Sequence, residues 1–221
     1  MENSLIITSD GSHTIYVPDL DEHYHSIYGA IAESEHIFIK AGYHNCVANP
    51  ISIFEAGFGT GLNALITALE SYKYKSNRTV YYTGIEKYPL ADDIISQINY
   101  HKFLGVESGS VFRRIHSSSW ESCINICGSF YLKKIKADLT DFQFAEKYDL
   151  IYFDAFGPLK QPEMWTRDVI SNIASATNTN GIFMTYSARG EVRRNLESCG
   201  FKVSLLPGPA GKRQIIRAIK I

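Results

Sequence analysis

Short apolar runs of strand length alternate with stretches of helical periodicity along most of the chain. The alternation begins with "ISIFEA", after which apolar residues recur with the spacing of a helix. The predicted strands are 51–56, 79–86, 130–137, 148–156, 181–187, 201–208 and 213–221, and the predicted helices are 61–74, 89–100, 162–176 and 189–198. Residues 101–129 show no clear hydrophobic period, so we predict an irregular segment there.

The first part of the chain has a different pattern. The stretch "LIITSDGSHTIYV" holds two apolar runs around Asp10 and Gly11, which predicts a β-hairpin. Apolar positions at helical spacing then predict a helix over 27–40. No repeat, low-complexity tract or Pro/Ser linker divides the chain, so we expect residues 1–221 to form a single domain.

Strands alternating with helices imply βαβ units, and hence an α/β fold with a doubly wound, mostly parallel, Rossmann-like sheet. The last two predicted strands are joined by residues 207–211, which contain two prolines and two glycines, so they add a C-terminal antiparallel strand. Ligands of such sheets bind beyond the carboxyl ends of the strands. We therefore expect the functional residues at the carboxyl ends of the strands.

The composition indicates the kind of protein and the cellular compartment. The hydrophobic fraction is 45% and the charged fraction 20%, which is typical of a globular protein with a sizeable core. No apolar run reaches the roughly 18 residues that span a bilayer, and the N-terminus lacks the pattern of a secretory signal. Four cysteines without a framework spacing favour a reduced, cytoplasmic protein.

The charges are segregated along the chain. Residues 1–55 carry eight acids and one base, whereas residues 189–221 carry eight bases and two acids. A basic end can face phosphates and bind nucleic acid without regard to sequence. The alternative is that these bases are the solvated faces of one helix and one strand.

Three glycines follow the first parallel strand. Gly57, Gly59 and Gly61 come just after Glu55, where glycine permits a tight turn and a close approach to a ligand. Dinucleotide sites prefer G-x-G-x-x-G, but the position of that third glycine is Leu62 here. The glycine pattern alone is not specific.

Acids end three further strands. Glu86 can accept hydrogen bonds from ribose hydroxyls, and Asp138 from the amino group of adenine, although Asp is also a common turn residue. Asp154 can orient an amine and accept its proton, with Phe156 stacking on a flat base nearby. The alternative is that Asp154 caps the next helix and Phe156 belongs to the core.

Together, "FEAGFGTGLN", "YFDAFGPLKQPEMW" and "YSARGEVRRNLESCGF" resemble the methyltransferase half of the MnmC family. The resemblance implies a class I S-adenosylmethionine-dependent methyltransferase fold. It also implies methylation of 5-aminomethyl-(2-thio)uridine at the wobble position of tRNA, which gives the 5-methylaminomethyl form. The N-terminal segments "DGSHTIYV" and "DEHYHS" stand in the family's order, so the resemblance covers nearly the whole chain.

The resemblance also assigns roles. The methionine end of S-adenosyl-L-methionine is expected to contact Glu55, Gly57, Gly59, Gly61 and Asn63, the ribose Glu86, the adenine Asp138, and the aminomethyl group Asp154 and Phe156. Ala137 replaces a typical glycine, and Gly157-Pro158 replaces a usual Ala-Pro pair. No FAD-dependent oxidase segment follows Ile221, so a stand-alone methyltransferase is expected.

The substrate side is expected to involve both ends of the chain. Residues 1–48 would form a hairpin-and-helix extension over the substrate side of a core at 49–221, with Tyr24 and His25 meeting the nucleobase; simple packing of this segment is the alternative. The expected contacts to anticodon stem-loop phosphates are Arg189, Arg193, Arg194, Lys212 and Arg213. The pair His23 and His25 lacks further ligands at metal spacing, so no metal is expected.

Two other classes of protein remain open. An aminopropyltransferase of the spermidine-synthase type shares the glycine loop and the acid of the second strand, but it usually carries a further polar or acidic residue after the acid of the fourth strand. Only Asp154 is present at that place here. A non-catalytic tRNA-binding protein would have no need of intact acids at four strand tips.

Overall fold

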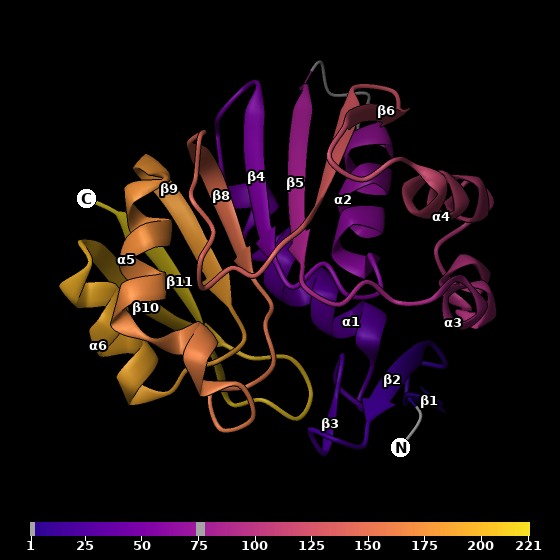
Figure 1. Cartoon of the computed structure of the whole chain (residues 1–221), viewed down its shortest axis with the longest axis horizontal. Coiled ribbons are helices and arrows are strands. Elements are labelled where there is room, and N and C mark those ends of the chain that lie inside the picture. The colour runs from indigo at the N-terminus through magenta and orange to yellow at the C-terminus, as the bar shows by residue number, and fades with distance from the viewer. Residues whose placement is uncertain (1–2, 74–77) are drawn as a thin grey trace.

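The computed structural model describes residues 3–73 and 78–221. Within them, a central sheet has the order β10-β11-β9-β8-β4-β5-β7-β6 (Figure 1). Its strands are β4 (Ile51–Ala56), β5 (Val80–Glu86), β6 (Cys123–Cys127), β7 (Phe130–Lys136), β8 (Tyr148–Phe153), β9 (Thr177–Thr185), β10 (Phe201–Pro207) and β11 (Gln214–Lys220). β4, β5, β7, β8 and β9 are parallel, and β11 is antiparallel to both β9 and β10. The predicted α/β sheet with a C-terminal antiparallel strand is confirmed.

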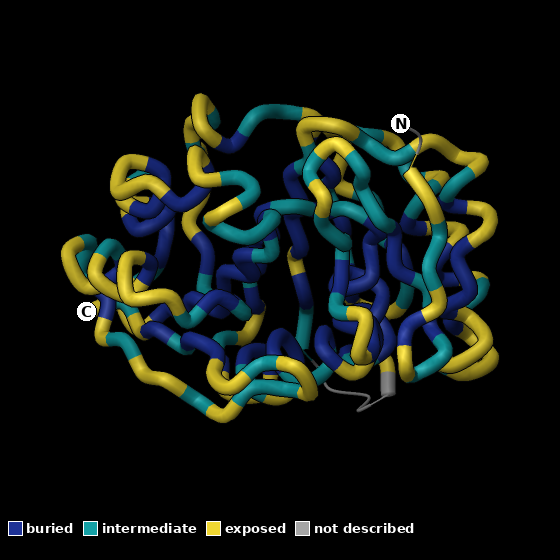
Figure 2. The backbone as a smooth tube through the Cα atoms, turned by 90° about the horizontal axis from the view of Figure 1, so that it is seen from below, coloured by how far each residue is buried: buried dark blue, intermediate teal, exposed yellow. Residues whose placement is uncertain are grey.

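The parallel strands are buried on both faces, which explains their continuous apolar sequences. Along β4 and β8, neighbouring residues enter opposite cores: Ile53 and Tyr152 pack into one, Phe54 and Phe153 into the other. All four side chains are fully enclosed. Figure 2, seen from below, shows the buried backbone through the middle of the molecule, with exposed turns around it.

Helices cover the sheet on both sides. α2 (Leu62–Lys73) and α4 (Ser108–Ser117) contribute to the core that contains Ile53, whereas α5 (Arg167–Ser175) and α6 (Gly190–Ser198) contribute to the core that contains Phe54. No helix among the described residues is long and apolar enough to cross a membrane.

Several predicted helices are shorter than their patterns. The helix expected at 27–40 begins at α1 (Ala30–Ser34), after Gly29 with φ +138°, and continues as a π-helical turn, Glu35–Lys40. The helix expected at 89–100 is reduced to α3 (Asp92–Gln97) and a 3-10 turn, Tyr100–Lys102.

The helix expected at 61–74 begins at Leu62. The helix expected at 162–176 is divided at Thr166, whose hydroxyl accepts a hydrogen bond from the Val169 N–H and so starts α5 after a 3-10 turn, Pro162–Trp165. Position 74 of the helix expected at 61–74 lies outside the described residues.

The stretch 101–129 is not irregular. It holds α4, whose inward face carries Val111, Phe112 and Ile115, and strand β6 at the edge of the sheet. Cys123 and Cys127 lie on β6.

The N-terminal segment lies beyond the carboxyl ends of β4 and β5 (Figure 1). β1 (Ser4–Ile7), β2 (His13–Val17) and β3 (Glu22–His23) form an antiparallel sheet, and the pairing of Ile7 with His13 confirms the hairpin around Asp10-Gly11. This small sheet is placed over the edge where ligands of α/β folds bind.

Thr60 ties the N-terminal segment to the loop after β4. Its hydroxyl accepts a hydrogen bond from the Tyr100 hydroxyl at 3.0 Å and lies 2.9 Å from His25 Nε2, while its carbonyl oxygen lies 3.1 Å from His116 Nε2. Thr60, Tyr100 and His25 are all buried. Three segments distant in sequence thus fix one residue of the glycine loop.

Thr60→Val removes this shared hydroxyl and leaves two buried polar groups without a partner. We expect the free energy of unfolding to fall by about 2–4 kcal/mol, since each such group costs about 1–3 kcal/mol. Urea denaturation measures the change. Thr177→Val is the matched control, because the equally buried Thr177 hydroxyl donates only to the Ile173 carbonyl, which also accepts from the Ala176 N–H. Equal losses in the two variants would contradict the role assigned to Thr60.

Candidate cofactor and substrate site

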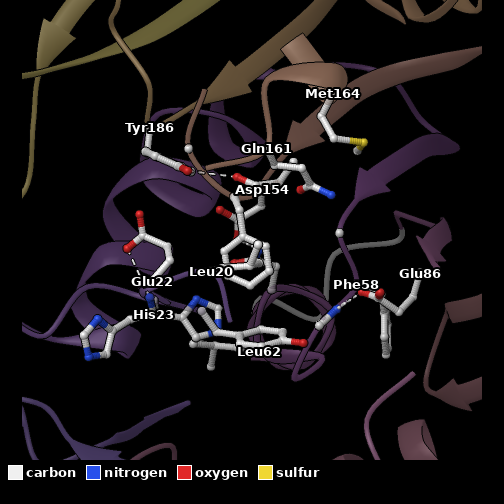
Figure 3. Close-up of a pocket in the computed structure, with 18 of the residues that line it drawn as sticks. Leu20, Glu22, His23, Phe58, Leu62, Glu86, Asp154, Gln161, Met164 and Tyr186 are labelled. Carbon is white, nitrogen blue, oxygen red and sulfur yellow. Dashed lines mark hydrogen bonds between the residues drawn. The ribbon is translucent and has the colours of Figure 1, made fainter. Parts of the chain in front are cut away.

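A cavity of about 570 Å³ opens at the carboxyl edge of the sheet. Its walls come from the glycine loop, the tips of β5, β7 and β8, the N-terminal segment and the loop between β10 and β11. Of the residues singled out in the sequence, those that line it are Tyr24, His25, Gly57, Gly59, Asn63, Glu86, Asp138, Asp154, Phe156 and Lys212. Figure 3 shows Glu86 on one side, Glu22 and His23 on the other, and Asp154 between them.

The glycine loop requires its glycines. Gly57, Gly59 and Gly61 have φ values of +84°, +50° and +71°, which other residues rarely adopt. A Cβ atom on Gly57 would lie 2.9 Å from the carbonyl oxygen of Asp154, and one on Gly59 would lie 2.9 Å from the ring of Tyr24. Gly61 does not line the cavity; it lies just before the first residue of α2.

Asn63 joins two carboxyl groups. Its amide Nδ2 donates to Glu55 Oε1 at 2.9 Å and to Asp154 Oδ2 at 2.8 Å. Glu55 is buried beneath the cavity and does not line it. Asn63 Oδ1 is buried and has no hydrogen-bond partner among the described residues, so it can accept from a ligand in the cavity.

Burial dominates the electrostatics of this group. It raises the pKa of Glu55 well above its usual range, with the hydrogen bond from Asn63 acting in the opposite direction. Burial also raises the pKa of Asp154 to about 7, helped by the negative charge of Glu33. Asp154 can therefore exchange a proton near neutral pH.

The two acids expected at the ribose and adenine lie at neighbouring strand tips. Glu86 accepts the Gly59 N–H at 3.0 Å and the Tyr88 N–H at 2.9 Å, one on each carboxylate oxygen, and each oxygen keeps a further lone pair. Asp138 is paired with Lys87 at 2.6 Å, and this contact is the main reason that its pKa is lowered to about 2.

Asp138 also accepts the N–H and the hydroxyl of Thr140, at 3.0 and 2.8 Å. Asp138 is thus a turn residue and also lines the cavity, so the two roles considered from the sequence do not exclude each other.

The loop after β8 is held by two aromatic side chains. The Tyr186 hydroxyl donates to the Ala155 carbonyl oxygen at 2.8 Å, and Trp165 Nε1 donates to the Phe156 carbonyl oxygen at 2.7 Å. The Phe156 ring meets the ring of Tyr24 edge to face, with centroids 5.1 Å apart. Phe156 is therefore part of the cavity wall, not of the core.

His25 has a structural contact in addition to its place in the wall. Its Nε2 is engaged with Thr60, and burial lowers its pKa to about 4, so the ring is neutral at physiological pH. Between the two members of the expected nucleobase pair, Tyr24 presents the larger surface to the cavity.

The basic residues expected to contact tRNA lie in two different places. Arg189, Arg193, Arg194 and Arg213 are exposed and do not line the cavity. Lys212 does line it, and its ammonium lies 2.6 Å from Glu33 Oε1. Lys212 is therefore already paired inside the site.

The wall residues that sequence reasoning missed include Glu22, Glu33 and Tyr186. Tyr186 follows β9, so the strand-tip argument that found Glu86 and Asp154 could have found it too. Nothing in the local sequence marks Glu22 or Glu33, because they reach the cavity through the placement of the N-terminal segment.

Comparisons with known proteins find relatives of similar sequence and fold. Residues 115–221 match a family described as S-adenosyl-L-methionine-dependent methyltransferase. The bifunctional protein MnmC of tRNA 5-methylaminomethyl-2-thiouridine biosynthesis, from Leptospira interrogans, is 31% identical over 214 residues, covering 89% of this chain and 32% of the relative. The chain spans about a third of the length of the curated relatives it matches.

Two solved structures are similar. MNMC2 from Aquifex aeolicus superposes with a TM-score of 0.81 at 25% identity, covering 98% of this chain and 69% of that one. Spermidine synthase from Thermotoga maritima gives a TM-score of 0.57 at 15% identity, covering 100% and 72%, which is a likeness of fold alone.

The chain has the fold of the class I S-adenosyl-L-methionine-dependent methyltransferases, and residues 115–221 match a family model of that description. The chain resembles MnmC and MNMC2 over nearly all of its length.

The residues present fit S-adenosyl-L-methionine. The orphaned, buried Oδ1 of Asn63 suits the donor hydrogens of the methionine ammonium. Glu86 has lone pairs left for ribose hydroxyls. Among residues 3–73 and 78–221, no cluster of three or more His, Cys, Asp or Glu side chains is placed to hold a metal ion.

Gly57→Ala would place a methyl group against the Asp154 carbonyl oxygen. We expect the affinity for S-adenosyl-L-methionine, measured by isothermal calorimetry, to fall about tenfold or more, which corresponds to about 1.4 kcal/mol. Gly105→Ala is a matched control: its φ is +89°, but nothing lies within 4 Å of the added Cβ. Both variants carry a backbone cost of about 1–2 kcal/mol. If the control weakened binding as much as Gly57→Ala, backbone strain alone would explain the loss.

Proposed function

We propose that the chain transfers a methyl group from S-adenosyl-L-methionine to the primary amine of 5-aminomethyl-(2-thio)uridine at the wobble position of tRNA. The observation that carries this proposal is the placement of Asp154, a titratable carboxyl at the tip of β8, between the glycine loop and the aromatic wall made by Phe156 and Tyr24. The names of the relatives support the choice of a modified uridine in tRNA.

Asn63, Gly57, Gly59 and Glu86 would hold the cofactor, with Asp138 beside the adenine. When bound, S-adenosyl-L-methionine supplies an electrophilic methyl group. The task of the chain is then to place a neutral amine in line with that group, and such positioning can be worth up to about 7–11 kcal/mol.

Asp154 has two tasks toward the amine. A free alkylamine has a pKa of about 10 and is mostly protonated at neutral pH. The Asp154 carboxylate accepts a hydrogen bond from the ammonium and orients it. Because the pKa of Asp154 is itself raised to about 7, the carboxylate can then take one ammonium proton, which leaves the nitrogen lone pair free for attack. Asp154 returns the proton to water after the product leaves.

The uracil ring would stack on an aromatic face, and Phe156 and Tyr24, whose rings meet edge to face, each offer one. The exposed Arg189, Arg193, Arg194 and Arg213 are the groups available for tRNA phosphates. The same proposal takes residues 1–48 as a cover over the substrate side of the core at 49–221. It also places the enzyme in the cytoplasm with its tRNA.

Methyl transfer to bulk tRNA that carries 5-aminomethyl-(2-thio)uridine but lacks the added methyl group tests the proposal. Nucleosides from tRNA that lacks this modification are analysed by mass spectrometry before and after incubation with the chain and the cofactor. We expect 5-methylaminomethyl-(2-thio)uridine to appear, and Asp154→Asn to slow its formation by about 10²–10⁴-fold. The exposed Asp168→Asn is the control. Transfer by Asp154→Asn at the control rate would refute the role of Asp154.

Two further arms separate the alternatives. Aminopropyl transfer to a diamine from the decarboxylated cofactor would identify the spermidine-synthase type of reaction. Absence of cofactor binding in calorimetry would identify a non-catalytic protein.

Charge reversal tests the basic surface. We expect Arg193→Glu together with Arg194→Glu to weaken tRNA binding by about tenfold and to reduce its salt dependence by about one unit of slope for each phosphate that the variant no longer neutralises. Affinity for S-adenosyl-L-methionine should not change. Lys147→Glu, just before β8 and therefore at the opposite edge of the sheet, is the control. Parallel loss of cofactor and tRNA binding would indicate damage to the fold instead.

A further inference from the structure

An ion pair inside the cavity is not used by the proposed reaction. Lys212 Nζ, from the loop between β10 and β11, lies 2.6 Å from Glu33 Oε1 of α1. The other oxygen of Glu33 accepts the Ser26 N–H at 2.8 Å, and the Glu33 side chain is 10% exposed. A largely buried pair of opposite charges, held from both sides, has a well-defined position.

The pair is connected to the loop that carries Asp154. The Lys212 ammonium lies over the ring of Tyr186, 4.9 Å from its centroid. The hydroxyl of the same Tyr186 donates to the Ala155 carbonyl oxygen, next to Asp154 (Figure 3). One ring therefore contacts both Lys212 and the residue that follows Asp154.

The surroundings of Asp154 are otherwise acidic. Titratable groups from six parts of the chain interact electrostatically with Asp154. They are Glu33, Glu55, Tyr82, Tyr100, Tyr186 and Lys212. Glu22 also lines the cavity. Among these groups Lys212 carries the only positive charge.

We propose that Glu33 and Lys212 are positioning residues for Asp154: their opposed charges, seated on Tyr186, set the electrostatic surroundings in which Asp154 meets the substrate amine. The inference rests on the proposed function for the identity of that amine. Glu33 favours the protonated form of Asp154 and Lys212 favours the carboxylate. Within the intact pair the two effects oppose each other.

The proposal predicts shifts of opposite sign. In Lys212→Met the Glu33 carboxylate is left uncompensated, so the pKa of Asp154 should rise from about 7 by about one unit. In Glu33→Gln the ammonium is left uncompensated, so the pKa should fall by a similar amount. The double variant should return close to the unsubstituted protein, because both charges are gone.

Carbon-13 NMR of a chain labelled at aspartate carboxyl groups measures these values without any substrate. The Asp154 signal is assigned by its loss in Asp154→Asn. Shifts of the same sign in both single variants, or no shift in either, would overturn the proposal. A structural role alone would lower thermal stability in each variant but would not give opposite shifts that cancel in the double variant. If Lys212→Met does not fold, Glu33→Gln still supplies a signed test, and Lys212→Arg should keep the unsubstituted value.

The pH dependence of methyl transfer gives a second readout. Because the carboxylate form of Asp154 is the active one, the rate should fall as pH decreases through about 7. The midpoint of this fall should move upward in Lys212→Met and downward in Glu33→Gln. Absence of methyl transfer by the unsubstituted protein would defeat the proposed function, yet the NMR titration would still decide the role of the ion pair.

Discussion

The site depends on the hydrogen bonds that Asn63 makes to Glu55 and Asp154. Two carboxyl groups are brought into a space with little water, where each would repel the other and where burial disfavours both charges. The amide nitrogen has two hydrogens and donates one to each acid. Its oxygen is buried and has no hydrogen-bond partner among the described residues. The Asn63 side chain thereby allows two acidic side chains to lie close together at neighbouring strand tips, and it offers an acceptor to the ligand.

Much of this arrangement could be predicted from the sequence because it depends on local rules. Glu55, Glu86 and Asp154 each end an apolar run, and parallel strands bring their carboxyl ends to one edge of the sheet. The glycines after Glu55 indicated where the backbone would come closest to a ligand. The cofactor half of the cavity therefore follows from strand order and a single turn.

The substrate half could not be predicted in the same way, because long-range contacts create it. Glu33 and Lys212 are 179 positions apart, and neither has a neighbour in sequence that indicates the pairing. The helix α4 was missed because its buried positions occupy fewer than three turns, and β6 because an edge strand has a weak pattern. His25 was expected at the substrate, yet its ring nitrogen is bound to Thr60, a contact that only the folded N-terminal segment creates.

The position of β11 affects how the molecule is assembled. It lies between β9 and β10 and forms antiparallel ladders with both, although it follows both of them in sequence. A growing polypeptide on the ribosome can order β4, β5, β7, β8 and β9 first, but β10 has no partner until residues 214–220 have been synthesised. The loop that bears Lys212 is closed by the same event. A chain still in translation would thus hold an incomplete pocket, and binding competence would arise only with its final strand.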